Sequence, residues 1–365
     1  MKKGIAALLI CLLLTGCWDQ IKLKDQLFVD IVGVDYVGDS KKLKVGYVIS
    51  SLREASQGGG KPFSLYFEEP GDSIYDSVGK TNESMPGVLT VQETRLYLIT
   101  PRFAKDEPLN YLSSAGQFIS NPLYAHLAVY DGDFTELLSR KKIKEQTVPD
   151  FMNGLIDNEM KRGDIPTNKL LRYILGGTDF ISDYAINRLV PDKEGARLAG
   201  TALFRDGKYT GINLNNAQTQ LACLMAGVPA KIQVITSQTE GKVYSIRVRS
   251  AKNDYRIIHS DKSLREIDIS LKMSVKLIED GPAVKNHTNP MLQEMEKAIA
   301  ADLTKKAESI IATLQKANCD YFQLGHELAA YHPKLYKGMN WREEYPKLTI
   351  KPKIKVTILN TGVLD

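Results

Sequence analysis

Hydrophobic and polar residues alternate in the first part of the chain with the two-residue period of strands that bury one face. Residues 27–35 and 42–50 both follow this period, and Gly38-Asp39-Ser40 between them supplies a turn. We expect these two strands to pair as a hairpin. Similar runs predict strands at 63–67, 95–100 and 124–130, with helices after Ser73 and Pro108.

Between residues 149 and 190 the period becomes that of a helix. Its apolar residues fall on two stripes: Phe151, Leu155, Ile156 and Met160, then Leu170, Leu171, Ile174 and Leu175. Gly176-Gly177 is expected to end the helical stretch. The segment 190–195 is polar and contains Pro191 and Gly195, so it is the best candidate for a boundary between domains.

The second half of the chain begins with two strands, within 199–211, joined by Asp206-Gly207. This dipeptide supplies the positive φ angles of a tight hairpin. Asn215 or Asn216 is expected to start a helix that reaches about Gly227. Strands are predicted at 231–236, 243–249, 255–259 and 267–277, then a long helix at 290–318 with one apolar face, and a last strand at 347–359.

This order of elements is not a repeating alternation of strand and helix. It predicts an α+β fold of two to three modules, with mixed or antiparallel sheets and a long amphipathic helix in the C-terminal domain. We expect a signal peptide at 1–16, a lipidated N-terminus and tether at 17–26, an N-terminal α+β region at 27–192 and a C-terminal α+β domain at 198–363. The N-terminal region divides into two lobes if the helical stretch from about 149 is separate.

The first seventeen residues have the pattern of an export signal. Lys2 and Lys3 precede an uncharged run from 4 to 14, and Leu14-Thr15-Gly16-Cys17 follows at once as a lipobox. As a helix this run spans roughly 16 Å, about half of a hydrocarbon core. We therefore expect Cys17 to receive a diacylglycerol group that holds the chain at a membrane. The alternative is a plain secretory signal with a coincidental cysteine.

Composition narrows the class of protein further. The 365 residues are 25% charged and 43% hydrophobic, as in ordinary globular proteins, which excludes a disordered or collagen-like chain. The formal charge of +5 is spread along the sequence and gives no reason to expect nucleic acid as a partner. Two cysteines remain after the signal region, Cys223 and Cys319, and we favour two free thiols over a disulfide between them.

Catalytic motifs are mostly missing. Gly79-Lys80-Thr81 ends like a phosphate loop, but Ile74 stands where the motif needs a glycine. His326 and His332 are six residues apart, whereas the zinc-protease helix places its histidines four apart on one face. There is no Gly-x-Ser-x-Gly elbow. We expect no catalytic residue, no bound metal and no cofactor.

The last predicted strand carries lysine at alternate positions. Lys351, Lys353 and Lys355 share one face there, with apolar residues between them. Such a face is usually solvated and protects the edge of a sheet. The other interpretation places this face near anionic lipid headgroups.

Several segments have a distinctive composition. The chain has Gly16-Cys17-Trp18-Asp19, followed by Gly33-Val34-Asp35, near its start. Residues 199–208 are predicted to form a strand pair with a charged turn, and residues 319–325, with the stretch from Trp341 to Gly362, make up a C-terminal block. These segments resemble the corresponding parts of the Ger(x)C family, the lipoprotein C subunits of spore germinant receptors in endospore-forming bacteria. The resemblance implies three α+β domains, no enzymatic activity, and a complex with A and B membrane subunits at the spore inner membrane.

Our first hypothesis is therefore a non-enzymatic, lipid-anchored receptor subunit that docks against membrane partners. The second is a solute-binding lipoprotein of a transporter, a class that usually has two lobes of alternating strand and helix. The third is a lipid-anchored hydrolase, for which the sequence offers no nucleophile or metal motif.

Overall fold

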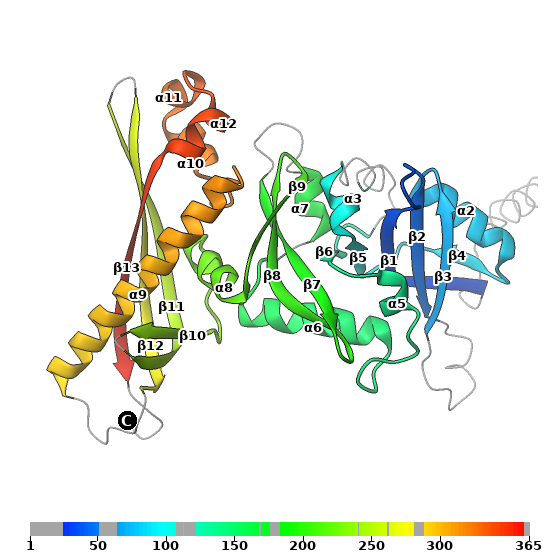
Figure 1. The fold of residues 1–365 in the computed structure, drawn as a ribbon, viewed down its shortest axis with the longest axis horizontal. Helices are drawn as coiled ribbons and strands as arrows, with labels where there is room; N and C mark the ends of the chain where they lie inside the picture. Colours follow the sequence, from blue (N-terminus) through cyan, green and yellow to red (C-terminus); the bar gives the residue numbers. More distant parts are fainter. Residues whose placement is uncertain are drawn as a thin grey trace, which may run out of the picture.

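The structure is a computed structural model, and it describes a chain of two β-sheets. The described residues are 25–50, 64–106, 112, 122–167, 169–175, 183–239, 241–260, 263–280 and 288–360. The predicted signal peptide, Cys17, the Gly176-Gly177 stop and all but Leu112 of the helix expected after Pro108 lie outside them. Figure 1 shows the two sheets side by side along the long axis of the molecule, the N-terminal sheet at one end and the C-terminal sheet at the other. The fold is α+β, as predicted.

The first sheet has nine strands in the order β3-β2-β1-β5-β6-β7-β8-β9, with β4 beside the start of β1. The hairpin expected at the N-terminus is present, since β1 and β2 pair antiparallel. The middle of the sheet, from β1 through β5 and β6 to β7, is parallel. The strands are β1 (Gln26–Tyr36), β2 (Leu43–Ser50), β3 (Ser64–Gly71), β4 (Val88–Thr90), β5 (Leu96–Ile99), β6 (His126–Tyr130), β7 (Tyr184–Asp192), β8 (Gly195–Arg205) and β9 (Lys208–Leu214).

Helices cover both faces of this sheet, and a buried apolar cluster lies on each side of it. Ser73 caps the first of them, as its sequence position indicated: its side chain accepts a hydrogen bond from the Asp76 N–H. The helices described here are α2 (Ile74–Ser84), α3 (Pro101–Lys105), α5 (Phe134–Leu138), α6 (Val148–Arg162) and α7 (Leu170–Leu175).

The region around residue 190 differs from expectation. Residues 184–190, which we placed in the helical stretch, form β7 and pair with β6 and β8. The segment 190–195 is the turn of the β7–β8 hairpin, in which Asp192 faces Gly195. The first sheet therefore continues to Leu214, and the chain crosses to the second sheet through α8 (Asn216–Met225).

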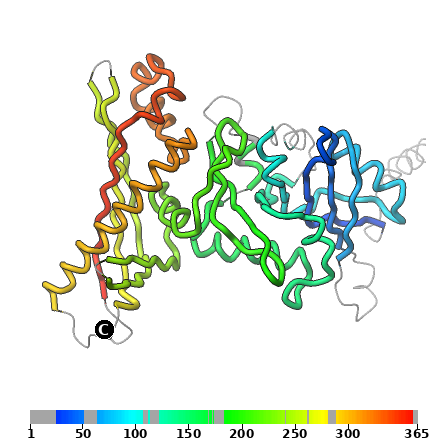
Figure 2. Tube along the Cα trace, in the orientation of Figure 1, coloured from blue at the N-terminus to red at the C-terminus, as the bar shows by residue number. Residues whose placement is uncertain are grey.

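The second sheet has four strands in the order β10-β11-β12-β13. The predicted strands at 243–249 and 255–259 are one long strand, β11, with a bulge between Val248 and Ser250. The long helix α9 (Asn289–Lys316) lies along this sheet, as the trace in Figure 2 shows. The strands are β10 (Val234–Thr239), β11 (Lys242–His259), β12 (Leu264–Glu279) and β13 (Thr349–Asn360). Short helices between α9 and β13 are α10 (Leu324–Tyr331), α11 (Pro333–Lys337), α12 (Trp341–Glu344) and the 3-10 turn η4 (Tyr345–Lys347).

One buried cluster joins the two sheets. It contains the apolar face of α9 and of the second sheet, and also Ala185, Leu203 and Leu214 from the end of the first sheet. Cys223 and Cys319 both lie in this cluster and both are free thiols, as predicted.

Candidate functional site: a buried polar joint between the sheets

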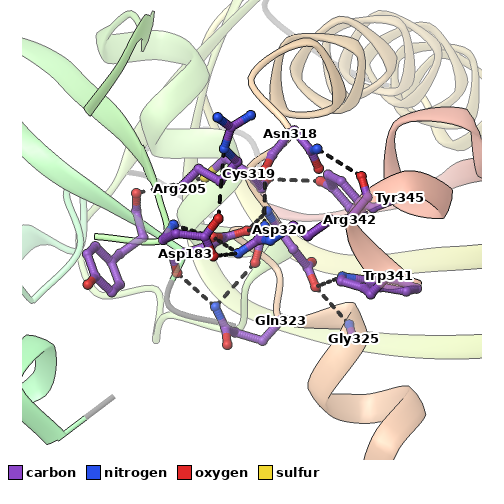
Figure 3. A network of polar contacts seen from close by, with 12 residues as sticks. Asp183, Arg205, Asn318, Cys319, Asp320, Gln323, Gly325, Trp341, Arg342 and Tyr345 are labelled. Atoms are coloured by element: carbon purple, nitrogen blue, oxygen red, sulfur yellow. Dashed lines mark hydrogen bonds and ion pairs between the residues drawn. The ribbon is translucent and has the colours of Figure 1, made fainter. Parts of the chain in front are cut away.

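Four segments that are far apart in the sequence bring polar side chains together where the two sheets meet (Figure 3). Asp183 comes immediately before β7, and Asp206 lies in the turn between β8 and β9. The loop 318–323 follows α9, and Arg342 lies on α12. We call this group of residues the polar joint.

An ion pair between Asp183 and Arg342 is the centre of the polar joint. The guanidinium is bidentate, with Arg342 Nη1 at 2.6 Å from Asp183 Oδ2 and Arg342 Nη2 at 2.7 Å from Asp183 Oδ1. The Asp183 side chain is completely buried, whereas that of Arg342 is 24% exposed. Backbone N–H groups of Asp320 and Asp206 also donate to the Asp183 carboxylate, at 2.7 and 3.2 Å. Asp183 thus bonds both to the turn between β8 and β9 of the first sheet and to the loop and α12 that follow α9.

Asp320 fixes the conformation of the loop that follows α9. Its Oδ1 accepts from the Leu324 N–H at 2.9 Å, and its Oδ2 accepts from the Gly325 N–H at 2.7 Å and the Trp341 Nε1 at 3.1 Å. Asp320 therefore caps the start of α10 and ties it to α12. Gln323 completes the loop, since its Nε2 donates to the Asp183 carbonyl oxygen at 2.8 Å.

The close approach of α10 to Trp341 depends on Gly325. A Cβ atom at this position would lie 2.7 Å from Trp341 Nε1, closer than real side chains allow. Beside the tryptophan, the Tyr345 hydroxyl donates to the Cys319 carbonyl oxygen at 3.0 Å. The motif from Cys319 to Gly325 is therefore a compact turn that packs against α12 and η4.

The electrostatics of the joint follow from its burial. Burial raises the pKa of Asp320 to about 6, although the N–H groups of Gly325 and Leu324 act to lower it. Burial by itself would lower the pKa of Arg342, but hydrogen bonds and charges of Asp183 and Asp206 outweigh it and raise that pKa. Burial also raises the pKa of the Cys319 thiol well above its usual value. Arg342 stays charged, and the thiol stays protonated at neutral pH.

This arrangement holds segments in place. Every carboxylate oxygen of Asp183 and Asp320 accepts at least one hydrogen bond from the protein. The group therefore fixes how the β7–β9 end of the first sheet meets the loop after α9. Since its acceptors are already saturated, its chemistry is that of a structural clamp.

Of the residues that the sequence singled out, Cys319 lies in the polar joint and the others lie elsewhere. Cys17, the predicted lipidation site, is outside the described residues. His126 is buried and lies 2.8 Å, through Nε2, from Asp157 Oδ1, while the rings of His259 and His332 contact edge to face. Among the described residues no group of His, Cys, Asp and Glu could hold a metal ion, and no described helix is long and apolar enough to cross a membrane.

Sequence analysis did not identify Asp183 or Arg342. Three signals pointed near the joint, the Asp206-Gly207 turn, the segment 319–325 and the stretch from Trp341 to Gly362, and all belong to the segments that carried the family resemblance. The structure brings these three segments together around Asp183.

Comparison with known proteins identifies this two-sheet α+β chain as a spore germination protein. A family model described as "Spore germination protein N-terminal domain" matches residues 19–181, and one described as "Spore germination B3/ GerAC like, C-terminal" matches residues 199–362. The two matches leave out only 1–18, 182–198 and 363–365. The chain therefore belongs to the GerAC-like family of spore germination proteins, which confirms the resemblance seen in its sequence.

Individual relatives agree with this assignment. Spore germination protein KC of Bacillus subtilis (strain 168) is 24% identical, with 99% of this chain and 95% of the relative covered. The putative spore germination protein YfkR of the same organism is 20% identical, with 99% and 97% covered. A crystal structure of the GerBC protein superposes with a TM-score of 0.61 at 15% identity, over 90% of this chain and 97% of that one, so the fold is shared.

Proposed function

We propose that this chain is the lipid-anchored C subunit of a spore germinant receptor, and that it acts without enzymatic activity by docking against membrane-embedded A and B subunits. The observation that carries the proposal is the pair of family matches, which together span almost the whole chain. The lipobox at Leu14-Thr15-Gly16-Cys17 supports the anchor. Two sheets joined by a shared apolar cluster and by the polar joint suit a subunit that presents surfaces to partners.

The architecture of the described residues also separates this proposal from a transporter-type solute-binding lipoprotein. Two similar lobes with parallel sheets are typical of that class. Here the nine-stranded and four-stranded sheets differ in strand order, and only the first has a parallel middle. The two sheets are not related lobes.

The test is recovery of partners from detergent-solubilised spore membranes with the tagged protein, wild type beside Cys17→Ala. We expect two multi-spanning proteins with the wild type and their loss with Cys17→Ala, because the anchor would hold the body beside them. Recovery of the wild type alone, or with transporter subunits, would contradict the proposal. Partners retained by Cys17→Ala would mean that docking does not depend on the anchor.

A further inference from the structure

The four-stranded sheet has one face that α9 covers and one face that no described element covers. On β12 the odd-numbered positions from Ile267 to Leu277 are buried against α9 and belong to the cluster that joins the sheets. The intervening positions and their partners form what we call the outer face. Its charged residues are Arg247, Lys252, Asp254, Arg256, Glu266, Asp268, Lys272, Lys276, Lys351, Lys353 and Lys355.

The strand register divides these charges into compensated and uncompensated rows. Towards the end of the sheet near α10, Lys351 forms an ion pair with Glu266, and Lys353 forms one with Asp268. The next row contains Lys252, Lys272 and Lys355, which lie directly opposite one another on three adjacent strands. None of the three forms an ion pair with any residue that the structure describes.

A second like-charged pair lies further along the same face. Arg247 of β11 is opposite Lys276 of β12. Like charges directly opposite one another on paired strands are destabilising, because they repel each other at short distance. An ordinary solvated face avoids this by alternating signs, as the rows with Glu266 and Asp268 do. Negative charge that approaches these rows from outside would therefore stabilise them.

The neighbours of these rows indicate what carries that charge. Val243, Ile278 and Leu359 lie on the outer face beyond Arg247 and Lys276, and their exposed fractions are 41%, 47% and 60%. Lysines beside exposed aliphatic side chains on an open sheet face are suited to the headgroup region of a bilayer, where cations meet phosphates and aliphatic groups meet the acyl boundary. We propose that the outer face binds the anionic phospholipid surface of a membrane.

The proposal is tested on the chain from residue 17 onward with Cys17→Ser, so that no lipid anchors it. Co-sedimentation is measured with vesicles of phosphatidylcholine alone and of equal parts phosphatidylcholine and phosphatidylglycerol. We expect binding to the anionic vesicles only, weakened by salt. The variant Lys252→Gln/Lys272→Gln/Lys355→Gln should lose binding by on the order of 100-fold, since each lysine contributes about fivefold at an anionic surface.

A matched control removes the same charge elsewhere. Lys316→Gln/Lys334→Gln/Lys337→Gln changes three exposed lysines on α9 and α11 and should bind as the parent does. The charge-preserving variant Lys252→Arg/Lys272→Arg/Lys355→Arg should also bind. The glutamine variant of the row should melt at the same temperature as the parent or higher, because repulsion is relieved; a lower melting temperature would overturn the proposal.

Two further outcomes would also overturn it. In the first, the parent binds neutral and anionic vesicles equally, or the row and control variants bind alike. In the second, the parent ignores vesicles but binds poly-glutamate through the same three lysines, which would assign the outer face to an acidic protein segment. Because the test uses Cys17→Ser, its failure would leave the proposed anchor and receptor role untouched.

Discussion

At the scale of single residues, the polar joint depends on a few side chains whose burial makes them hard to replace. Asp320 is 1% exposed and accepts three N–H donors. A carboxylate with so many donors is a stable arrangement only while each donor is present, since unpaired buried polar groups cost free energy. The environment nevertheless favours the protonated form, because burial raises the pKa of Asp320 to about 6.

This raised pKa predicts a pH dependence of stability. The folded-state pKa of Asp320 lies above its unfolded value of 3.8, so its contribution to stability is full below pH 3.8 and is lost as pH rises through about 6. Between these values the free energy of unfolding of the wild type should fall by about 2–3 kcal/mol relative to Asp320→Asn, which has no such group to titrate. Urea unfolding of both proteins across this pH range measures the difference.

The comparison with Asp320→Asn removes other titrations from the result. Burial lowers the pKa of His126, so this residue favours the folded state at high pH and acts in the opposite direction, but it is present in both proteins. Parallel pH profiles of the wild type and Asp320→Asn would contradict the assignment. Asp320→Asn should also be less stable at every pH in the window, because an amide cannot accept all three donors.

Gly200, in the segment 199–208, allows a second prediction at this scale. Its φ is +94°, and a Cβ atom there would lie 1.9 Å from the Leu214 carbonyl oxygen at the end of β9. Gly200→Ala should therefore lower the free energy of unfolding by several kcal/mol, on the order of 3 or more.

Gly154→Ala is the control: this helical position in α6 has nothing within 4 Å of the added atom. It should gain about 0.5–1 kcal/mol. Chemical denaturation compares the two, and equal effects would exclude the steric argument.

At the scale of elements, the sequence pattern was most informative where one face is buried and the other is wet. The capped helices α2 and α8 and the amphipathic helix α9 agree with their patterns. The hairpin β1–β2 also forms as predicted, although both of its faces are largely buried and not one alone. β7 was misread, because it is covered on both sides: Ala185 packs with one buried cluster and Ile186 with another. A strand that is apolar on both faces loses the two-residue period, and its spacing then imitates a helical stripe.

β11 shows the opposite failure. We predicted two strands, at 243–249 and 255–259, yet one strand runs from Lys242 to His259, with a bulge between Val248 and Ser250. Continuous pairing with β12 supplies the hydrogen bonds that the local pattern did not indicate. Such contacts join residues on different strands, so a short stretch of sequence taken by itself does not reveal them.

The apolar face of α9 allows a prediction at the element scale. Leu303 is fully buried in the middle of the helix, within the cluster that joins the sheets. Leu303→Ala should lower the free energy of unfolding by about 2–5 kcal/mol, through lost burial and the cavity left behind. Lys305→Ala, two residues along on the exposed side, should change it by less than about 0.5 kcal/mol. Similar losses in the two variants would show that α9 does not pack through this face.

At the scale of the whole molecule, the joint decides whether two sheets behave as one body. Asp183 and Arg342 are 159 residues apart in sequence, and Asp183 and Asp320 are 137 apart. No local motif relates positions so distant, which is why sequence analysis reached the segments 199–208 and 319–325 but missed the ion pair between Asp183 and Arg342 beside them. The family models do not identify this residue either, because Asp183 lies in the gap between the two matched regions.

The last prediction concerns this ion pair. Arg342→Met leaves the fully buried Asp183 carboxylate without its countercharge, so this variant should lower the free energy of unfolding by about 3–5 kcal/mol. Asp183→Asn should cost less, about 1–3 kcal/mol, because Arg342 is partly exposed and keeps its ion pair with Asp206. The double variant should cost less than the two losses added together, because it leaves neither charge unpaired. Hydrogen exchange should rise first around residue 183 and in 318–325, while β1, β5 and β6 keep their protection, since these strands lie in clusters away from the joint. Additive losses, or exchange that rises equally across the first sheet, would mean that Asp183 and Arg342 act independently and that the two sheets are held together by their shared apolar cluster instead.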